Sequence, residues 1–144
     1  LHPHVRELNA IAIEELQHFD LVLNLLAERN IPFGPAMRSP WISGMMSHVR
    51  KGRKEQAIDH LICLALIEGR SCEKFQILAE GIRDLDQPLA DFYASLVESE
   101  GNHYATYLIF ARHIDEAETQ RRLDYFLKID AQLITQNHGL PILH

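Results

Sequence analysis

Glu15-Leu16-Gln17-His18 (residues 15–18) and Glu100-Gly101-Asn102-His103 (residues 100–103) decide the fold of this chain, because each places an E-x-x-H pattern inside an apolar stripe. The stripes advance in steps of three and four, as one face of a helix does. Their members are Leu8, Ile11, Glu15, His18, Val22 and Leu25 in one segment, and Tyr93, Leu96, Glu100, His103, Tyr107 and Ala111 in the other. Residues three apart share a helix side, so each carboxylate and imidazole can converge on one point. A buried carboxylate needs a compensating charge, and the pattern therefore predicts a buried divalent metal.

Proline and glycine divide the rest of the chain into helices. We expect five, over residues 5–30, 40–51, 54–80, 87–113 and 115–136, with boundary errors of about two to four residues. No alternating strand pattern extends beyond a few residues, so the predicted class is all-α. With 144 residues and 47% hydrophobic content, we expect a single domain over residues 1–144.

The third expected helix supplies a further candidate ligand. Glu68 lies on its apolar stripe between Ala65 and Cys72, so it should point inward. Helical bundles that hold two metal ions use an E-x-x-H from each of two helices and one glutamate from each of the other two. The sequence supplies five of these six ligands. The expected architecture is thus a ferritin-like four-helix bundle with additional helices, lacking the first helix and its glutamate in this chain.

Composition narrows the class of protein. Cys63 and Cys72 are too close in sequence to close a useful loop, and they read as reduced packing residues of a cytoplasmic protein. No apolar run reaches the length of a membrane span, about 18 residues, and no secretory leader is visible, so we expect no membrane association. Carboxylate and imidazole ligands favour iron or manganese over metals that prefer thiolates.

Four strings carry a resemblance to a known family: Glu14-Glu15-Leu16-Gln17-His18-Phe19, Arg29-Asn30-Ile31-Pro32-Phe33-Gly34-Pro35, Ile67-Glu68-Gly69-Arg70-Ser71-Cys72-Glu73-Lys74-Phe75 and Ser99-Glu100-Gly101-Asn102-His103-Tyr104. They resemble the MiaE-type tRNA hydroxylases, ferritin-like di-iron proteins, over nearly the whole chain. The stretch around Arg70-Ser71-Cys72-Glu73 is the most specific.

The resemblance implies a non-haem di-iron monooxygenase. It implies that dioxygen and two electrons from an unidentified donor hydroxylate the isopentenyl group of a hypermodified adenosine beside the tRNA anticodon. By analogy with ferritin-like sites, Glu15 and Glu100 would bridge the two irons, and we expect no catalytic residue beyond the metal ligands. The matching positions in this chain are Glu15, His18, Glu68, Glu100 and His103.

A tRNA substrate requires a basic surface, whereas the chain carries a net charge of −6. The junction of the second and third expected helices is the best candidate for phosphate contacts. Its residues are Arg50, Lys51, Arg53 and Lys54, with Arg38 nearby in sequence. The other interpretation of this junction is an ordinary charged loop. The acidic cluster Asp115, Glu116 and Glu118 reads as a solvated face.

Two other functions fit the same helices. A ferritin-like or rubrerythrin-like protein would bind iron for storage or for removal of peroxide, and it would not need a basic junction. A helical module without its first helix would be inactive, or would borrow a glutamate from a partner chain.

Overall fold

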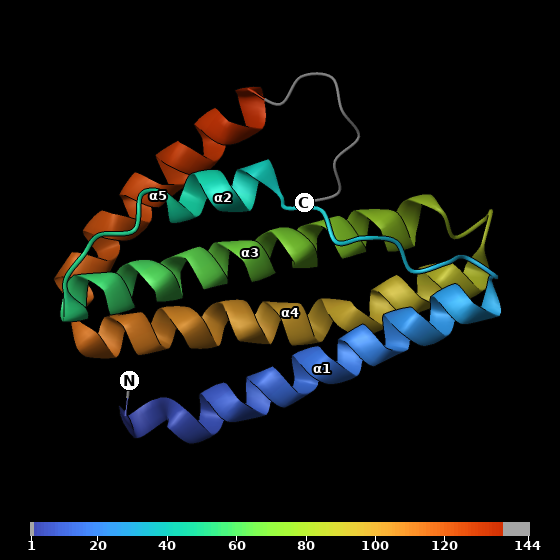
Figure 1. Cartoon of the computed structure of the whole chain (residues 1–144), viewed down its shortest axis with the longest axis horizontal. Coiled ribbons are helices and arrows are strands. Elements are labelled where there is room, and N and C mark those ends of the chain that lie inside the picture. The colour runs from blue at the N-terminus through green and yellow to red at the C-terminus, as the bar shows by residue number, and fades with distance from the viewer. Residues whose placement is uncertain (1, 137–144) are drawn as a thin grey trace. The chain divides into compact units, whose positions relative to one another are not determined.

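The computed structural model describes residues 2–136 and shows only helices and connecting segments over that range (Figure 1). A short 3-10 helix, His2–His4, leads into the first α-helix. The α-helices are α1 (Val5–Glu28), α2 (Pro40–Met46), α3 (Arg53–Gly81), α4 (Gln87–Ile114) and α5 (Glu116–Gln136). The all-α prediction is confirmed. None of these described helices has both the length and the apolar character needed to cross a bilayer.

The second helix is shorter than predicted. It ends at Met46, and residues 47–52 form a connection to α3 instead. The backbone N–H of Arg50 donates to Oδ2 of Asp59 at 3.0 Å, so this connection is held by a contact with the next helix. Gly52 follows with a φ of +117°, a conformation that favours glycine. The prediction that this helix reaches residue 51 was therefore wrong.

The chain divides between Arg38 and Ser39 into two compact units. The N-terminal unit, up to Arg38, contains α1 and the extended segment that follows it. The C-terminal unit, from Ser39 onward, contains α2, α3, α4 and α5. The prediction of a single domain over residues 1–144 stays a prediction.

In the N-terminal unit the chain reverses direction after α1. Asn30 has a φ of 55°, in the left-handed region that commonly ends a helix. The backbone N–H of Ile31 donates to the carbonyl of Leu26 at 2.9 Å, which satisfies one of the last carbonyls of the helix. Because the chain turns back here, the rings of Phe19 and Phe33 meet edge to face with centroids 5.7 Å apart. The segment after α1 thus packs against its own helix.

In the C-terminal unit α3 and α4 run antiparallel, side by side along most of their length (Figure 1). Asp86 caps α4 by accepting a hydrogen bond from the Leu89 backbone at 3.0 Å, and Pro88 occupies the first turn. Both helices contribute apolar side chains to the core. Its buried members on these helices include Ile58, Leu61, Ile62, Ala65 and Leu66 on α3, and Ala90, Leu96, Tyr107, Leu108, Phe110 and Ala111 on α4.

The two cysteines lie on α3, as predicted. Both are free thiols, Cys63 buried and Cys72 half-buried. Burial raises the pKa of the Cys63 thiol to about 12, so that residue is an inert packing group.

The helices α2 and α5 pack against each other and against α3. Trp41 of α2 is fully buried and donates its indole N–H to Asp130 of α5 at 2.8 Å. Arg70 of α3 holds the same carboxylate through two hydrogen bonds of 2.8 and 2.6 Å. One buried carboxylate therefore joins three helices.

Candidate metal centre

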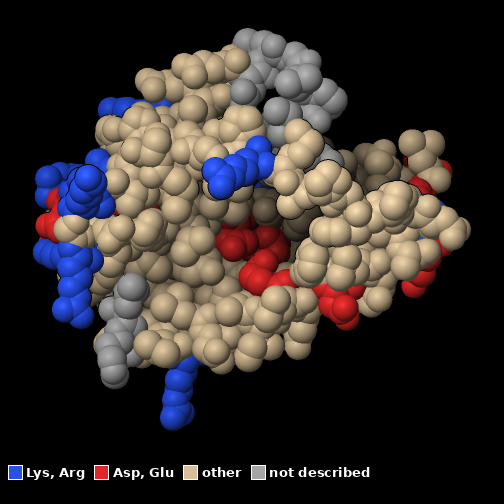
Figure 2. Space-filling model, viewed as in Figure 1, with Lys and Arg blue, Asp and Glu red and all other residues tan. Residues whose placement is uncertain are grey.

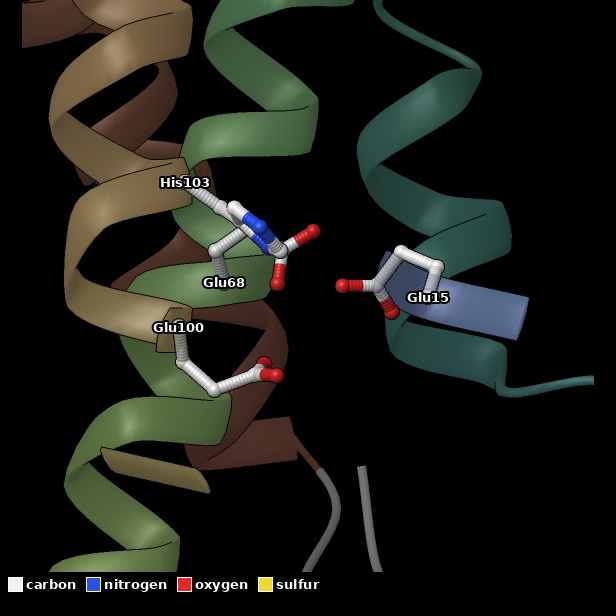
Figure 3. Close-up of side chains that lie close together, drawn as sticks. All are labelled: Glu15, Glu68, Glu100 and His103. Carbon is white, nitrogen blue, oxygen red and sulfur yellow. The ribbon is translucent and has the colours of Figure 1, made fainter. Parts of the chain in front are cut away.

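Glu68 of α3 and Glu100 and His103 of α4 lie together in the C-terminal unit (Figure 3). Their side chains are buried, with residues 7%, 5% and 3% exposed, respectively. Each can offer a ligand atom within 4.8 Å of those of the other two. We call these residues the carboxylate–histidine triad. The structure thus brings together three of the five residues predicted as metal ligands.

The helices approach closely at the level of the triad. Gly69 follows Glu68, and a Cβ added there would lie 3.0 Å from Cδ2 of Tyr104. Gly101 follows Glu100, and a Cβ there would lie 3.7 Å from Sγ of Cys72. The sequence therefore places glycine directly after each glutamate, which lets α3 and α4 come close enough for ligands from both helices to converge.

The donor set of the triad fits a metal ion. Two carboxylates at this separation repel each other, and burial strengthens the repulsion because little water screens it. Lys74 is half-buried nearby; burial lowers its pKa, while the charge of Glu100 opposes that shift. Oxygen and imidazole donors together suit iron or manganese, as the sequence predicted.

The other E-x-x-H pair, Glu15 and His18, lies on α1, in the N-terminal unit. Nδ1 of His18 is 3.6 Å from Oε1 of Glu15, so the pair shares one face of its helix, as expected for i and i+3 positions. The His18 side chain is 19% exposed and the Glu15 side chain 44% exposed. Glu15 is also labelled in Figure 3, where it comes from α1.

The residues predicted to contact phosphate fall into two groups. Arg50 donates to both oxygens of Asp59 at 2.9 Å and to Glu118 at 2.6 Å, and Lys54 pairs with Asp115 at 2.7 Å. The other three, Arg38, Lys51 and Arg53, have exposed side chains. Arg38 ends the N-terminal unit. The prediction that these five residues contact phosphate stays a prediction.

Asp59, which binds the predicted phosphate contact Arg50, was not singled out from the sequence. It is fully buried on α3, and Arg122 of α5 also donates to both of its oxygens at 2.9 Å. Burial raises the pKa of this carboxyl, yet the hydrogen bonds from Arg50 and Arg122 outweigh that effect, so its pKa lies below the ordinary value. The one sequence signal was its position beside Ile58 on the apolar face of a helix.

The acidic cluster after α4 also differs from expectation. Asp115 and Glu118 are half-buried, and they bind Lys54 and Arg50. Asp115 in addition accepts a hydrogen bond from the Glu118 backbone at 2.9 Å, as an N-cap for α5. The prediction of a purely solvated acidic face was wrong for these two residues, because the partners come from a distant part of the chain.

Comparison with known proteins decides the family. The family model described as tRNA-(MS[2]IO[6]A)-hydroxylase (MiaE) matches residues 2–144. The chain belongs to the MiaE family. The tRNA 2-(methylsulfanyl)-N(6)-isopentenyladenosine(37) hydroxylase of Salmonella typhimurium is 42% identical over 121 residues, which are 84% of this chain and 44% of that protein. The protein of the same name from Pseudomonas putida is 34% identical over 131 residues, which are 90% of this chain and 62% of that protein.

The chain thus spans less than two thirds of the length of either MiaE relative. A solved structure, described as Protein 43 with aldehyde deformylating oxygenase activity from Synechococcus, matches with a TM-score of 0.82 and 26% identity. The match covers 91% of this chain and 64% of that one. That neighbour is a ferritin-like helical protein, so the predicted ferritin-like class is confirmed for this MiaE chain.

Proposed function

We propose that this chain provides the metal-binding helices of a non-haem di-iron monooxygenase that acts on tRNA. Membership of the MiaE family supports the reaction class, and the names of two relatives support a hypermodified adenosine as the target. The single observation that carries the proposal is the triad of Glu68, Glu100 and His103, buried and converging from two antiparallel helices.

The proposed ligand set adds Glu15 and His18 of α1 to the triad. Together they give the two E-x-x-H pairs and one of the two single glutamates of a two-metal bundle site. One more carboxylate is needed, and we propose that it comes from outside this set of residues. The ligands would hold two iron ions, whose charge offsets that of the converging carboxylates.

The proposed reaction inserts one oxygen atom of dioxygen into a C–H bond of the isopentenyl group. The second oxygen atom leaves as water, formed with two electrons and two protons that an external donor supplies. Bound iron would supply the oxidising power for this chemistry. The chain's own residues hold the metal, and the apolar core around the triad excludes water from it. Because the substrate is tRNA, the proposed location is the cytoplasm.

Metal titration tests the site. We expect anaerobic addition of Fe²⁺ to raise the melting temperature and to leave iron bound after gel filtration. Glu68→Ala and Glu100→Ala should each lower the affinity for iron at least 100-fold, which corresponds to about 2.7 kcal/mol. Glu98→Ala is the matched control, because Glu98 is exposed on the same helix as Glu100. Unchanged iron content in both alanine variants would show that the triad is not the metal site.

A nucleoside assay tests the substrate. The iron-loaded protein, with dioxygen and a chemical reductant, should convert the isopentenyl adenosine of tRNA to a product that contains one additional oxygen atom, measured by mass spectrometry of digested tRNA. The longer Salmonella typhimurium relative should be assayed beside this chain, because this chain spans only 44% of that protein. Iron binding without any product in either protein would support iron storage instead of hydroxylation.

A further inference from the structure

Positive charge gathers at one end of the C-terminal unit, where α3 begins and α4 gives way to α5 (Figures 1 and 2). The chain has 14 lysines and arginines, and half of them lie in residues 50–59 and 112–122. These two segments carry a net charge of +2, whereas the rest of the chain carries −8. A polyanion would therefore be attracted to this end and repelled by the remaining surface.

The cations at this end form two layers. In the inner layer, Arg50 and Arg122 bind the buried Asp59, and Lys54 binds Asp115. Glu118 binds Arg50 and also Arg121, whose side chain is 74% exposed. Each cation of the inner layer is paired with a carboxylate, so these cations hold α3, α5 and their connections together.

The outer layer consists of exposed cations from four parts of the fold: the connection before α3, and the helices α3, α4 and α5. We call Lys51, Arg53, Arg112 and Arg121 the basic rim. Lys51 belongs to the connection before α3, Arg53 begins α3, and Arg112 lies in the last turn of α4. Within the part of the chain that the structure describes, no ion pair involves Lys51, Arg53 or Arg112. Their ammonium and guanidinium groups face solvent.

A cavity of about 400 Å³ lies between the two layers, and its lining shows where an anion would not bind. Arg50, Lys54 and Arg121 line it, but so do Glu55, Asp115 and Glu118. A phosphate inside this cavity would meet as many carboxylates as cations. The favourable positions for phosphates are therefore on the rim and not in the cavity.

We propose that the basic rim contacts the backbone phosphates of RNA and so docks the tRNA on this end of the C-terminal unit. The inference rests on the proposed tRNA substrate and names the surface that would receive it. Arg50 and Lys54, which the sequence predicted to contact phosphate, instead position the rim. The four residues of the rim make the phosphate contacts. RNA fits this surface because its backbone offers one negative charge per nucleotide and needs no deep pocket.

The test compares two charge-matched variants in RNA binding, measured by fluorescence polarisation of labelled tRNA over a series of salt concentrations. The rim variant carries Lys51→Gln, Arg53→Gln and Arg121→Gln. The control carries Arg6→Gln, Arg83→Gln and Lys128→Gln, which remove three exposed cations elsewhere. The rim variant should bind tRNA at least 10-fold more weakly. Its plot of log affinity against log salt should be shallower by about two to three, since each of the three lost contacts removes about 0.7–0.9 from the slope.

Each outcome decides between the proposals. Iron content and helical circular dichroism should match wild type in both variants, which shows that the fold and the metal site are intact. If both variants bind tRNA equally weakly, net charge alone determines the affinity. That result would contradict the proposal that the basic rim contacts the RNA. If the rim variant binds tRNA as tightly as wild type does, the basic rim is not the contact surface, whereas the tRNA hydroxylase proposal stands. Failure of the wild-type chain to bind tRNA at low salt, under conditions in which the longer Salmonella typhimurium relative binds it, would overturn both.

Discussion

Helix α3 carries two buried carboxylates, Asp59 and Glu68, whose surroundings are opposite in kind. Asp59 lies between the guanidinium groups of Arg50 and Arg122, which donate to both of its oxygens. Glu68 lies beside a second glutamate and an imidazole. The first carboxylate is neutralised by the chain's own cations, whereas the second lies in a group whose combined charge calls for a metal ion.

This difference shows that the groups around a buried acid indicate whether the acid has a structural or a functional role. A buried ion pair costs desolvation, but once formed it is expensive to break, because one charge would remain buried alone. Carboxylates that converge on each other lower the stability of the metal-free fold, and proteins keep such arrangements where function requires them. Both positions hold a buried carboxylate on the same helix, so burial and the kind of functional group cannot distinguish the two roles.

Replacement of Asp59 should give the largest effect on stability. Asp59→Asn removes the charge that Arg50 and Arg122 share, and we expect the free energy of unfolding to fall by about 3–5 kcal/mol. Urea unfolding at pH 7 measures this change. Asp84→Asn is the control, since Asp84 is exposed in the turn after α3 and its replacement should change stability by no more than about 0.5 kcal/mol. A loss below about 1 kcal/mol for Asp59→Asn would contradict a structural role.

The same carboxylate should make stability depend on pH. Its pKa in the folded protein lies below the ordinary value of 3.8, because the arginine hydrogen bonds outweigh burial. The unfolded chain therefore binds this proton first as pH falls, and the stabilisation is fully present above pH 3.8 and is lost below it. The difference in stability between wild type and Asp59→Asn should thus stay constant near neutrality and narrow in acid. A difference that persists unchanged well below that pH would contradict this explanation.

The sequence predicted that Glu68 is a buried functional acid, but it did not reveal the buried Asp59, and the reason is physical. Glu68 was recognised because the E-x-x-H pairs supplied a pattern that a third glutamate completes. Asp59 has the same kind of position, but one of its partners, Arg122, lies 63 residues away, and helical periodicity contains no information about such pairs. The second helix was predicted too long for a related reason, since the contact between Arg50 and Asp59 holds the segment after it as a connection to α3. The boundaries of the other four helices were predicted within two residues, because the signals that mark them, such as Gly81 and Pro88, act locally.

Replacement of Glu68 should change stability in the opposite direction. Glu68→Gln removes one of two converging negative charges, so we expect the metal-free protein to gain about 1 kcal/mol. The variant should then lose the stabilisation that metal gives the wild type, about 2.7 kcal/mol at a free metal concentration 100 times Kd. Urea unfolding with and without Fe²⁺ under anaerobic conditions measures both. Glu73→Gln, an exposed position on the same helix, is the control. A metal-free Glu68→Gln protein less stable than wild type would show that Glu68 is a structural acid like Asp59.

The smallest effect should come from the glycine beside Glu68, and it tests whether close packing of α3 and α4 belongs to the metal centre. Alanine is favoured over glycine in a helix by about 1 kcal/mol, so Gly81→Ala, where a Cβ meets nothing within 4 Å, should stabilise by up to that amount. At Gly69 the Cβ would lie 3.0 Å from Tyr104, and overpacking costs about 1–3 kcal/mol. Gly69→Ala should therefore be neutral or destabilising, and it should weaken iron binding because it moves the helix of Glu100 and His103 away from Glu68. Equal stabilisation by both alanines, with iron binding unchanged, would mean that Tyr104 moves aside and that the spacing of the helices does not set the geometry of the triad.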